Sequence, residues 1–486
     1  MMRALRWPAV AIVLLAGLTA AAIVDRPSAS PTRALRSSSL PVTSTSLVCP
    51  NISGSGRAPT AMTVANVSAA VAGGHRSATV RTFPLTSARA KTTTLPSHAV
   101  NHVHVTTTSG PTVVEADGRG AGAVVADQSR LIPHGVLRGM FSSPCLQPTT
   151  DSWITGADGR VGFTDTLVLA NADSTVANIT VTVWSAKGPI EPPQLESYTV
   201  AADTAELLPV SRYVPDGALL TIHVHANSGR LVSAVLDRRV SGVEPTGLDW
   251  IPPTQPPSTE LVVPGFLSGS GARHLVLADP GDRDATVTLR LVTASGNFAP
   301  AGHQTVVVRA GHSADVDLAS SLAGAPGAVL VHSDQPVTAT AFSSAAALND
   351  QDHPDLQFQP AAAAITGPAV LPDNTPPFDR NVRLYVTAPD AAAKLRVATT
   401  TGASRVLTIR AGRSLAWDPV AVFGTDAYGP LVFTPVGGGS VYVSRTLFAY
   451  GAHGPLTTAE QPTLLPASIS LPPAVLDERV AVPDAR

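Results

Sequence analysis

Apolar and polar residues alternate with a period of two along several stretches of the chain. The apolar side of one stretch consists of Val287, Leu289 and Leu291, and that of another consists of Ile179, Val181 and Val183. Because neighbouring side chains of a β-strand point to opposite faces, this pattern is typical of strands with one buried face. No long amphipathic helix or heptad pattern follows the N-terminal residues. The pattern therefore predicts an all-β protein.

A short apolar strand that ends in a small residue recurs along the chain. It reads AMTVAN, LVLAN, LVLAD and LYVTA at residues 61–66, 167–171, 275–279 and 384–388. The copies are spaced by roughly 105 to 110 residues, which is the size of one domain. Each copy ends in a segment that we interpret as a hairpin, with turns at DGRG, NSG, SDQP and GGG. These residues supply the φ angles that tight turns need.

Each copy offers enough strands for a small sandwich of two sheets. A propeller is the competing repeat architecture, but its blades are only about 40 to 50 residues long. We therefore expect a tandem array of about four Ig-like or fibronectin-like β-sandwich modules after an N-terminal hydrophobic helix. The expected divisions are a signal peptide or membrane anchor at 1–25, a Ser/Pro/Thr-rich spacer at 26–45, sandwiches at 46–142, 143–256, 257–368 and 369–465, and a C-terminal tail at 466–486.

The N-terminal residues have the character of an export signal. Arg3 and Arg6 precede an uncharged run at 7–24, and the run contains a small-x-small cleavage site at 20–22. Such a segment is either a cleaved signal peptide or a single-pass anchor that leaves the rest of the chain outside the membrane. Both alternatives stay open. No later window is long and apolar enough to cross a membrane.

The chain contains two cysteines, Cys49 and Cys145. In an oxidising compartment such an isolated pair favours one disulfide, and closing so long a loop would stabilise the fold by about 4 to 5 kcal/mol. The alternative is a pair of free buried thiols. Zinc would need more ligands than this pair provides.

The similarity between the copies extends to a known family. The segments LVLANADSTVANITVTVW, VVVRAGHSADVDL and GAVLVHSDQPVTATAF resemble the repeated unit of an uncharacterised family of exported actinobacterial envelope proteins. The resemblance covers residues 46–465. It implies a signal or membrane segment and extracellular β-modules, and it implies no established activity. The first and fourth copies are degenerate, and in the fourth Thr387 and Pro389 replace the Asn that usually follows the first strand.

The charge and the motifs exclude several classes of function. The formal net charge is −2, which leaves no excess of positive charge for nucleic acid. The sequence contains no G-x-S-x-G, H-E-x-x-H, P-loop, EF-hand or paired C-x-x-C motif. We therefore expect no catalytic residues, no cofactor and no nucleic-acid partner.

Histidines and one acidic loop are the remaining candidates for metal ligands. His102 and His104, and likewise His223 and His225, stand two residues apart and so share one face of a strand, a spacing that can bind a metal. The acidic loop at 349–355 could bind calcium but lacks a recognised ligand order. We interpret the histidines as solvated or capping residues and the loop as a solvated connection, and we expect no metal site.

These observations favour a non-enzymatic exported protein. We expect a chain tethered to the outer face of the cell membrane, or secreted into the cell wall, that acts as a spacer or binds an envelope protein or a cell-wall glycan. The alternative is a hydrolase or a carbohydrate-processing accessory with a site in one module. Its starting points would be Asp158, Asp165 and Asp203, because such an enzyme needs two carboxyl groups in one cleft.

Overall fold

The structure is a computed structural model that describes residues 38–52, 60–72, 76–86, 90–105, 110–349, 351–376, 381–465 and 468–471. The expected signal or anchor at 1–25 lies outside these residues. No helix in the described part of the chain is long and apolar enough to span a membrane. The chain forms two compact units. The larger unit, residues 41–467, contains every described element except one small sheet. The small sheet pairs β1 (Ser38–Pro41) with β36 (Ser468–Leu471).

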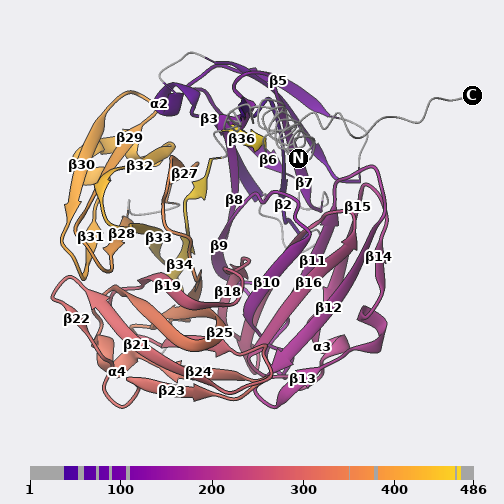
Figure 1. Cartoon of the computed structure of the whole chain (residues 1–486), viewed down its shortest axis with the longest axis vertical. Helices are drawn as coiled ribbons and strands as arrows, with labels where there is room; N and C mark the ends of the chain where they lie inside the picture. Colours follow the sequence, from indigo (N-terminus) through magenta and orange to yellow (C-terminus); the bar gives the residue numbers. More distant parts are fainter. Residues whose placement is uncertain are drawn as a thin grey trace, which may run out of the picture. The chain divides into compact units, whose positions relative to one another are not determined.

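Antiparallel β-sheets make up nearly all of the described chain (Figure 1), which confirms the expected all-β fold. Two sheets form in each of four segments, which we call repeats 1 to 4. Repeat 1 (residues 44–144) has the strand orders β2-β7-β4-β5 and β6-β3-β8-β9, with β2 (Ser44–Cys49), β3 (Thr60–Asn66), α2 (Ser68–Ala72), β4 (Ala78–Pro84), β5 (Lys91–Leu95), β6 (Val100–Val105), β7 (Thr112–Asp117), η1 (Ala121–Ala123), β8 (Val124–Ile132) and β9 (Gly139–Pro144).

Repeat 2 (residues 151–251) has the orders β10-β16-β12-β13 and β15-β11-β17-β18, with β14 also on β12. Its elements are β10 (Asp151–Ala157), β11 (Thr166–Asn171), β12 (Ala177–Ser185), β13 (Gly188–Ile190), η2 (Pro193–Leu195), β14 (Tyr198–Val200), β15 (Thr204–Pro209), α3 (Val210–Tyr213), β16 (Leu220–Ser228), β17 (Val232–Ser241) and β18 (Glu244–Ile251).

In repeat 3 (residues 258–360) one long strand, β25, belongs to both sheets, pairing with β19 and β21 at one end and with β20 and β26 at the other. The elements are β19 (Ser258–Phe266), β20 (Arg273–Ala278), β21 (Ala285–Thr293), β22 (Asn297–Phe298), β23 (Thr305–Val308), β24 (Ser313–Asp317), α4 (Ala319–Leu322), β25 (Gly327–Ala345) and β26 (Asp355–Pro360).

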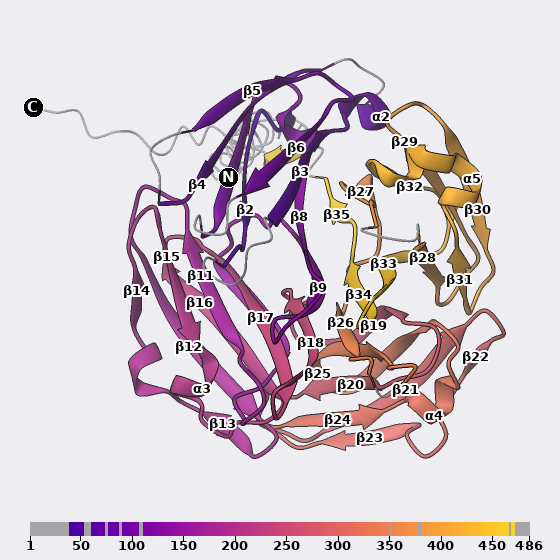
Figure 2. The same ribbon diagram turned by 180° about the vertical axis from the view of Figure 1, so that it is seen from behind.

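Repeat 4 (residues 369–464) has the orders β30-β29-β32-β27-β35 and β31-β28-β33-β34. Its elements are β27 (Ala369–Leu371), β28 (Asn381–Ala388), β29 (Ala393–Thr399), β30 (Ser404–Ile409), β31 (Arg413–Trp417), α5 (Val420–Phe423), η3 (Gly424–Tyr428), β32 (Leu431–Gly438), β33 (Tyr442–Gly451), β34 (Gly454–Glu460) and β35 (Thr463–Leu464). The view from behind shows the same four groups of strands (Figure 2).

The apolar side of each alternating strand faces a core between two sheets. In β21, Val287, Leu289 and Leu291 are fully buried, whereas Thr286, Thr288 and Arg290 are exposed. The core of repeat 4 likewise joins side chains from both of its sheets, among them Leu384 of β28 and Phe433 of β32. The period-two pattern therefore identified the buried faces correctly.

The strands that we interpreted as hairpins do not pair with each other. The two arms lie in opposite sheets in repeats 1, 2 and 4 (β7 and β8, β16 and β17, β32 and β33), and in repeat 3 the SDQP segment runs inside the continuous strand β25. The interpretation was wrong because alternation identifies strands but not their partners. Turn residues still serve these crossovers: Gly229 has a φ of +78°, and a Cβ there would stand 2.9 Å from the Cα of Ala177.

The expected boundaries also shift. Strands β1 and β2 begin inside the segment taken as a spacer, and β36 lies in the segment taken as a tail. The expected change from the first to the second module at 142–143 falls inside β9. Cys145, just beyond it, packs in the core of repeat 1 with Cys49, and the two form the expected disulfide.

In repeats 1 and 2 the asparagine that ends the recurring strand ties this strand to the next turn. The buried side-chain amide of Asn171 donates to the carbonyls of Thr175, Val200 and Ala201 at 2.8, 3.1 and 3.1 Å. Its carbonyl oxygen accepts the N–H of Asp173 at 3.0 Å. Asn66 makes the corresponding bonds in repeat 1. The recurring motif is therefore explained by buried backbone groups that need hydrogen-bond partners.

The last long strand of each repeat lies at a junction shared by all four repeats. Strands β9, β18, β26 and β34 contact one another in a closed cycle. Asp355 of β26 is buried there and accepts three backbone N–H groups, one from each other repeat: Met140 at 3.0 Å, Thr457 at 3.0 Å and Leu248 at 3.3 Å. Asp355 ends the loop that we interpreted as solvated, so this interpretation was wrong for its last residue.

Further buried polar groups connect the repeats at this junction. Asp249 of repeat 2 accepts the N–H of Phe358 at 3.3 Å and the hydroxyl of Thr458 at 3.0 Å. The buried guanidinium of Arg445 donates to Ser142 at 3.1 Å and pairs with Glu460 at 2.8 Å. Burial raises the pKa of Asp249 well above its usual value and also raises that of Glu460.

We predict that Asn171→Ala lowers the free energy of unfolding by about 2 to 3 kcal/mol, because it leaves buried carbonyls without donors. Urea denaturation monitored by circular dichroism measures the change. Asn227→Ala is the matched control, since Asn227 is exposed and bonds only Thr180 among the contacts described; its effect should stay within about 0.5 kcal/mol. Equal stability of Asn171→Ala and the wild type would contradict the role assigned to the motif.

Asp355 predicts a pH dependence of stability. Burial raises the pKa of Asp355 to about 7, against the opposing effect of its N–H donors. The folded protein then holds a proton that the unfolded chain releases above pH about 4, so the free energy of unfolding falls as pH rises from about 4 to about 7, by up to about 4 kcal/mol from this group. Denaturation curves measured between pH 4 and 8 test this.

Asp355→Asn should remove the part of the pH dependence of the unfolding free energy that comes from this one carboxyl group, because an amide does not ionise. The variant should also be less stable at pH 5, since an amide NH2 group, unlike the hydroxyl oxygen of a protonated carboxyl group, cannot accept a backbone N–H. Asp282→Asn, at a fully exposed carboxylate, is the control and should keep the wild-type profile. An unchanged slope in Asp355→Asn would refute the assignment.

Candidate functional site

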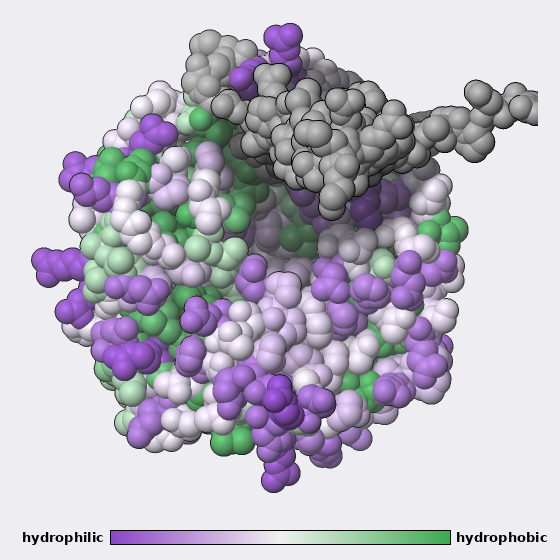
Figure 3. Space-filling view, in the orientation of Figure 1, coloured by the Kyte–Doolittle hydropathy of each residue, from purple (hydrophilic) through white to green (hydrophobic). Residues whose placement is uncertain are grey.

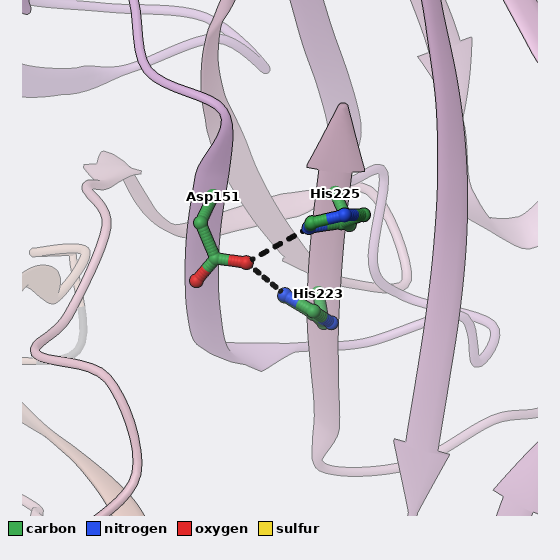
Figure 4. Close-up of side chains that lie close together, drawn as sticks. All are labelled: Asp151, His223 and His225. Carbon is green, nitrogen blue, oxygen red and sulfur yellow. Dashed lines mark hydrogen bonds and ion pairs between the residues drawn. The ribbon is translucent and has the colours of Figure 1, made fainter. Parts of the chain in front are cut away.

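The outer face of the sheet β10-β16-β12-β13 in repeat 2 brings together a carboxylate and two imidazoles. Asp151 of β10 stands opposite His225 of β16 in the strand register, and Trp153 stands opposite His223. Because His223 and His225 are two residues apart on one strand, their side chains leave the sheet on the same side. Asp151 reaches across from β10 to both imidazoles (Figure 4).

Both imidazoles point a nitrogen at the same carboxylate oxygen. Asp151 Oδ1 lies 2.6 Å from His223 Nε2 and 3.3 Å from His225 Nδ1. The His223 side chain is 19% exposed, that of His225 is 51% exposed and that of Asp151 is 42% exposed. The three groups therefore converge at a point that solvent can reach.

Aromatic rings orient the side chains of Asp151 and His223. The Trp153 ring stacks on His223 with ring centroids 3.9 Å apart, and it stacks on Trp184 at 5.3 Å. Trp153 Nε1 donates to Asp151 Oδ2 at 3.1 Å, which leaves Oδ1 for the imidazoles. Ring stacking and this hydrogen bond thus orient two of the three groups.

Asp151 remains ionised near neutral pH. Partial burial opposes its ionisation, but hydrogen bonds with His223 and His225 outweigh burial and hold the pKa of Asp151 below its usual value. A negatively charged oxygen thus stands beside two imidazole nitrogens.

A second candidate surface is a cavity between repeats 3 and 4, with a volume of about 410 Å³. Its floor is the outer face of β19, β21 and β25, and its wall comes from Tyr442 at the start of β33 and from the Pro389–Asp390 segment that follows β28. The polar side chains that line it carry both signs of charge: Glu260, Thr288, Arg290, His332, Asp390 and Tyr442. Burial, followed by the nearby carboxylates of Asp390 and Glu260, raises the pKa of Tyr442.

The two surfaces use corresponding strand positions. Glu260 stands opposite His332 between β19 and β25, as Asp151 stands opposite His225 between β10 and β16. Glu260 Oε1 lies 3.8 Å from His332 Nδ1. The place held by His223 in repeat 2 is held by Leu330 in repeat 3. Repeat 3 therefore has the acid–histidine pair without the second imidazole.

Sequence reasoning singled out His223 and His225 but missed the acidic residue that stands opposite them. Asp151 and Glu260 lie far from the histidines in sequence and meet them only through strand pairing. The repeat period was the signal that could have found them, since the two acids occupy corresponding strands. Of the other histidine pair, His102 is exposed and its Nδ1 lies 3.1 Å from the hydroxyl of Thr63, and the side chain of His104 lies outside the described residues.

Two of the three aspartates considered for a hydrolytic site lie close together, since the N–H of Asp158 donates to Asp165 Oδ2 at 2.7 Å. Asp158 and Asp165 are adjacent and buried, and Asp158 pairs with Arg160 at 2.7 Å. Burial, followed by the charge of Asp237, raises the pKa of Asp165 well above its usual value. Asp203 is an exposed turn residue with a φ of +54°. The acidic loop residue Asp352 is also engaged, by Tyr450 and by Asn349 at 2.9 Å.

Comparison with known proteins places the chain in a family but assigns no activity. The profile of a family of unknown function, DUF5719, matches residues 97–420, which is 324 of 486 residues. No curated protein matches. Among solved structures, the tetra-tandem repeat in the extending region of a large adhesion protein is similar at 12% identity over 87% of this chain and 99% of that chain, with a TM-score of 0.09. A TM-score of this size carries no argument about fold or function.

Proposed function

We propose that this chain, which belongs to the DUF5719 family of unknown function, is an exported, non-enzymatic binding module of the cell envelope. We infer that each repeat is one Ig-like or fibronectin-like sandwich module and that the shared junction holds the four modules as one scaffold. The cavity between repeats 3 and 4 supports this proposal most directly. Its volume of about 410 Å³ lies in the range of small-molecule sites.

The lining of the cavity favours a ligand rich in hydroxyl groups, such as a cell-wall glycan. Glu260 and Asp390 offer acceptors, and Arg290 and Tyr442 offer donors. Such groups bind neighbouring sugar hydroxyls through paired hydrogen bonds, while Val262 and Leu330 form an apolar floor. The face shown in Figure 3 has its hydrophobic residues in separate patches between polar ones, so polar side chains are available over much of it.

The disulfide supports export, because a persistent disulfide is typical of oxidising compartments. The N-terminal residues 1–25 add a signal or anchor by their sequence. The membrane contact, the location outside the cytoplasm and the absence of enzymatic activity remain parts of the proposal.

We predict that soluble cell-wall oligosaccharides bind the full chain and that Glu260→Gln or Asp390→Asn weakens binding about 5- to 10-fold, which corresponds to about 1 to 1.4 kcal/mol. Isothermal titration calorimetry measures the affinities. Glu191→Gln changes an exposed carboxylate away from the cavity and is the control.

The control should bind like the wild type, and equal affinities for all variants would place binding elsewhere. Parallel capture on immobilised cell-wall polysaccharide and on solubilised membrane proteins identifies the class of partner. Capture by membrane proteins alone would replace the glycan with a protein partner, and failure of both would leave only a spacer role.

Export predicts that both cysteines of the native protein are blocked. Alkylation of the chain recovered from its own cell envelope should label neither thiol before reduction and both after it, as measured by intact mass. N-terminal sequencing of the same sample distinguishes a cleaved signal peptide from a retained anchor. Labelling without reduction, or recovery only from the cytosol, would contradict export.

A further inference from the structure

We propose that Asp151, His223 and His225 form a binding site for one divalent transition-metal ion of the zinc type on the outer face of repeat 2. The proposal does not depend on the glycan site, which lies on repeats 3 and 4. It follows from the geometry of the three donor atoms and from the groups that surround them.

The donor atoms are of the right kind and close enough. Two imidazole nitrogens and one carboxylate oxygen are ligands that zinc and neighbouring transition metals prefer. All three atoms lie within 4.8 Å of one another. Metal–ligand bonds of about 2.0 to 2.2 Å place the ligands of a tetrahedral ion about 3.4 Å apart. Small side-chain rotations therefore allow an ion to replace the two histidine–aspartate contacts of 2.6 and 3.3 Å.

The surroundings prepare the site. A metal-binding carboxylate or imidazole is usually oriented by a second interaction behind it. Trp153 supplies two: its Nε1 bonds the far oxygen of Asp151, and its ring stacks on His223. His225 is half exposed, so an ion has a path from solvent. These supports are lacking at Glu260 and His332 in repeat 3, where Val262 and Leu330 take the places of Trp153 and His223.

Three protein ligands leave at least one coordination position of a bound zinc-type ion open. A bound ion in repeat 2 would therefore offer a place for a carboxylate, an imidazole or a hydroxyl group of another molecule. This distinguishes the site from a closed structural zinc site, which has four protein ligands.

Calorimetric titration of the full, untagged chain with Zn²⁺ tests the proposal. We expect one ion per chain and at least a 10-fold loss of affinity in His223→Ala and in His225→Ala. His332→Ala is the matched control, because it removes the corresponding histidine of repeat 3, and it should bind like the wild type. Circular dichroism and thermal melting verify that each variant is folded.

Tryptophan fluorescence gives an independent readout that depends on position. Ni²⁺ bound beside His223 should quench Trp153, and quenching should saturate at one equivalent. Trp153→Phe keeps a stacked ring and should lose part of the quenching while still binding one ion by calorimetry, and the quenching that remains should come from Trp184, whose ring centroid lies 6.5 Å from that of His223. Absence of saturable binding to the wild type, wild-type affinity in His223→Ala and His225→Ala, or a loss of affinity in His332→Ala would each overturn the proposal.

Discussion

The buried carboxyl group of Asp355 accepts backbone N–H groups from the three repeats to which Asp355 does not belong. A buried polar group that lacks a hydrogen-bond partner destabilises a fold by several kcal/mol at the majority of sites. The three N–H groups therefore need the carboxyl group of Asp355, and this carboxyl group needs them. The same holds for Asp249 and Arg445 at this junction. The repeats therefore depend on one another for stability. Their separation would leave the hydrogen-bonding groups of the four junction strands, β9, β18, β26 and β34, without partners in the protein.

Both candidate surfaces belong to outer strands, on the faces that remain after the cores are formed. Repeats 2 and 3 place an acid opposite a histidine at corresponding positions, Asp151 with His225 and Glu260 with His332. Two neighbouring substitutions give the surfaces different chemistry. In repeat 2, His223 adds a second imidazole to the proposed metal ligands and Trp153 stacks on it. In repeat 3, the corresponding residues Leu330 and Val262 form the apolar floor of a cavity. A repeated scaffold thus carries different sites without a change of fold.

The family match and the recurring motif describe the scaffold and leave its ligands open. Membership of an uncharacterised family is confirmed, while an actinobacterial origin and an envelope location stay predictions. Asn66 and Asn171 hold turns and are fully buried, so the residues that make the repeat visible in sequence are structural. The residues proposed to bind ligands stand mainly on other strands, which are β10 and β16 in repeat 2 and β19, β21 and β25 in repeat 3.

The sequence by itself determined the all-β fold, the buried faces of strands such as β21 and the cysteine pair, because these depend on local alternation and on a count of two cysteines. Tertiary structure alone decided the rest. The supposed hairpins cross between sheets, Asp355 is buried rather than solvated, and Asp151 meets His223 from a strand 72 residues away. Such contacts depend on which strands pair and which repeats touch, and a period of two contains no information about either.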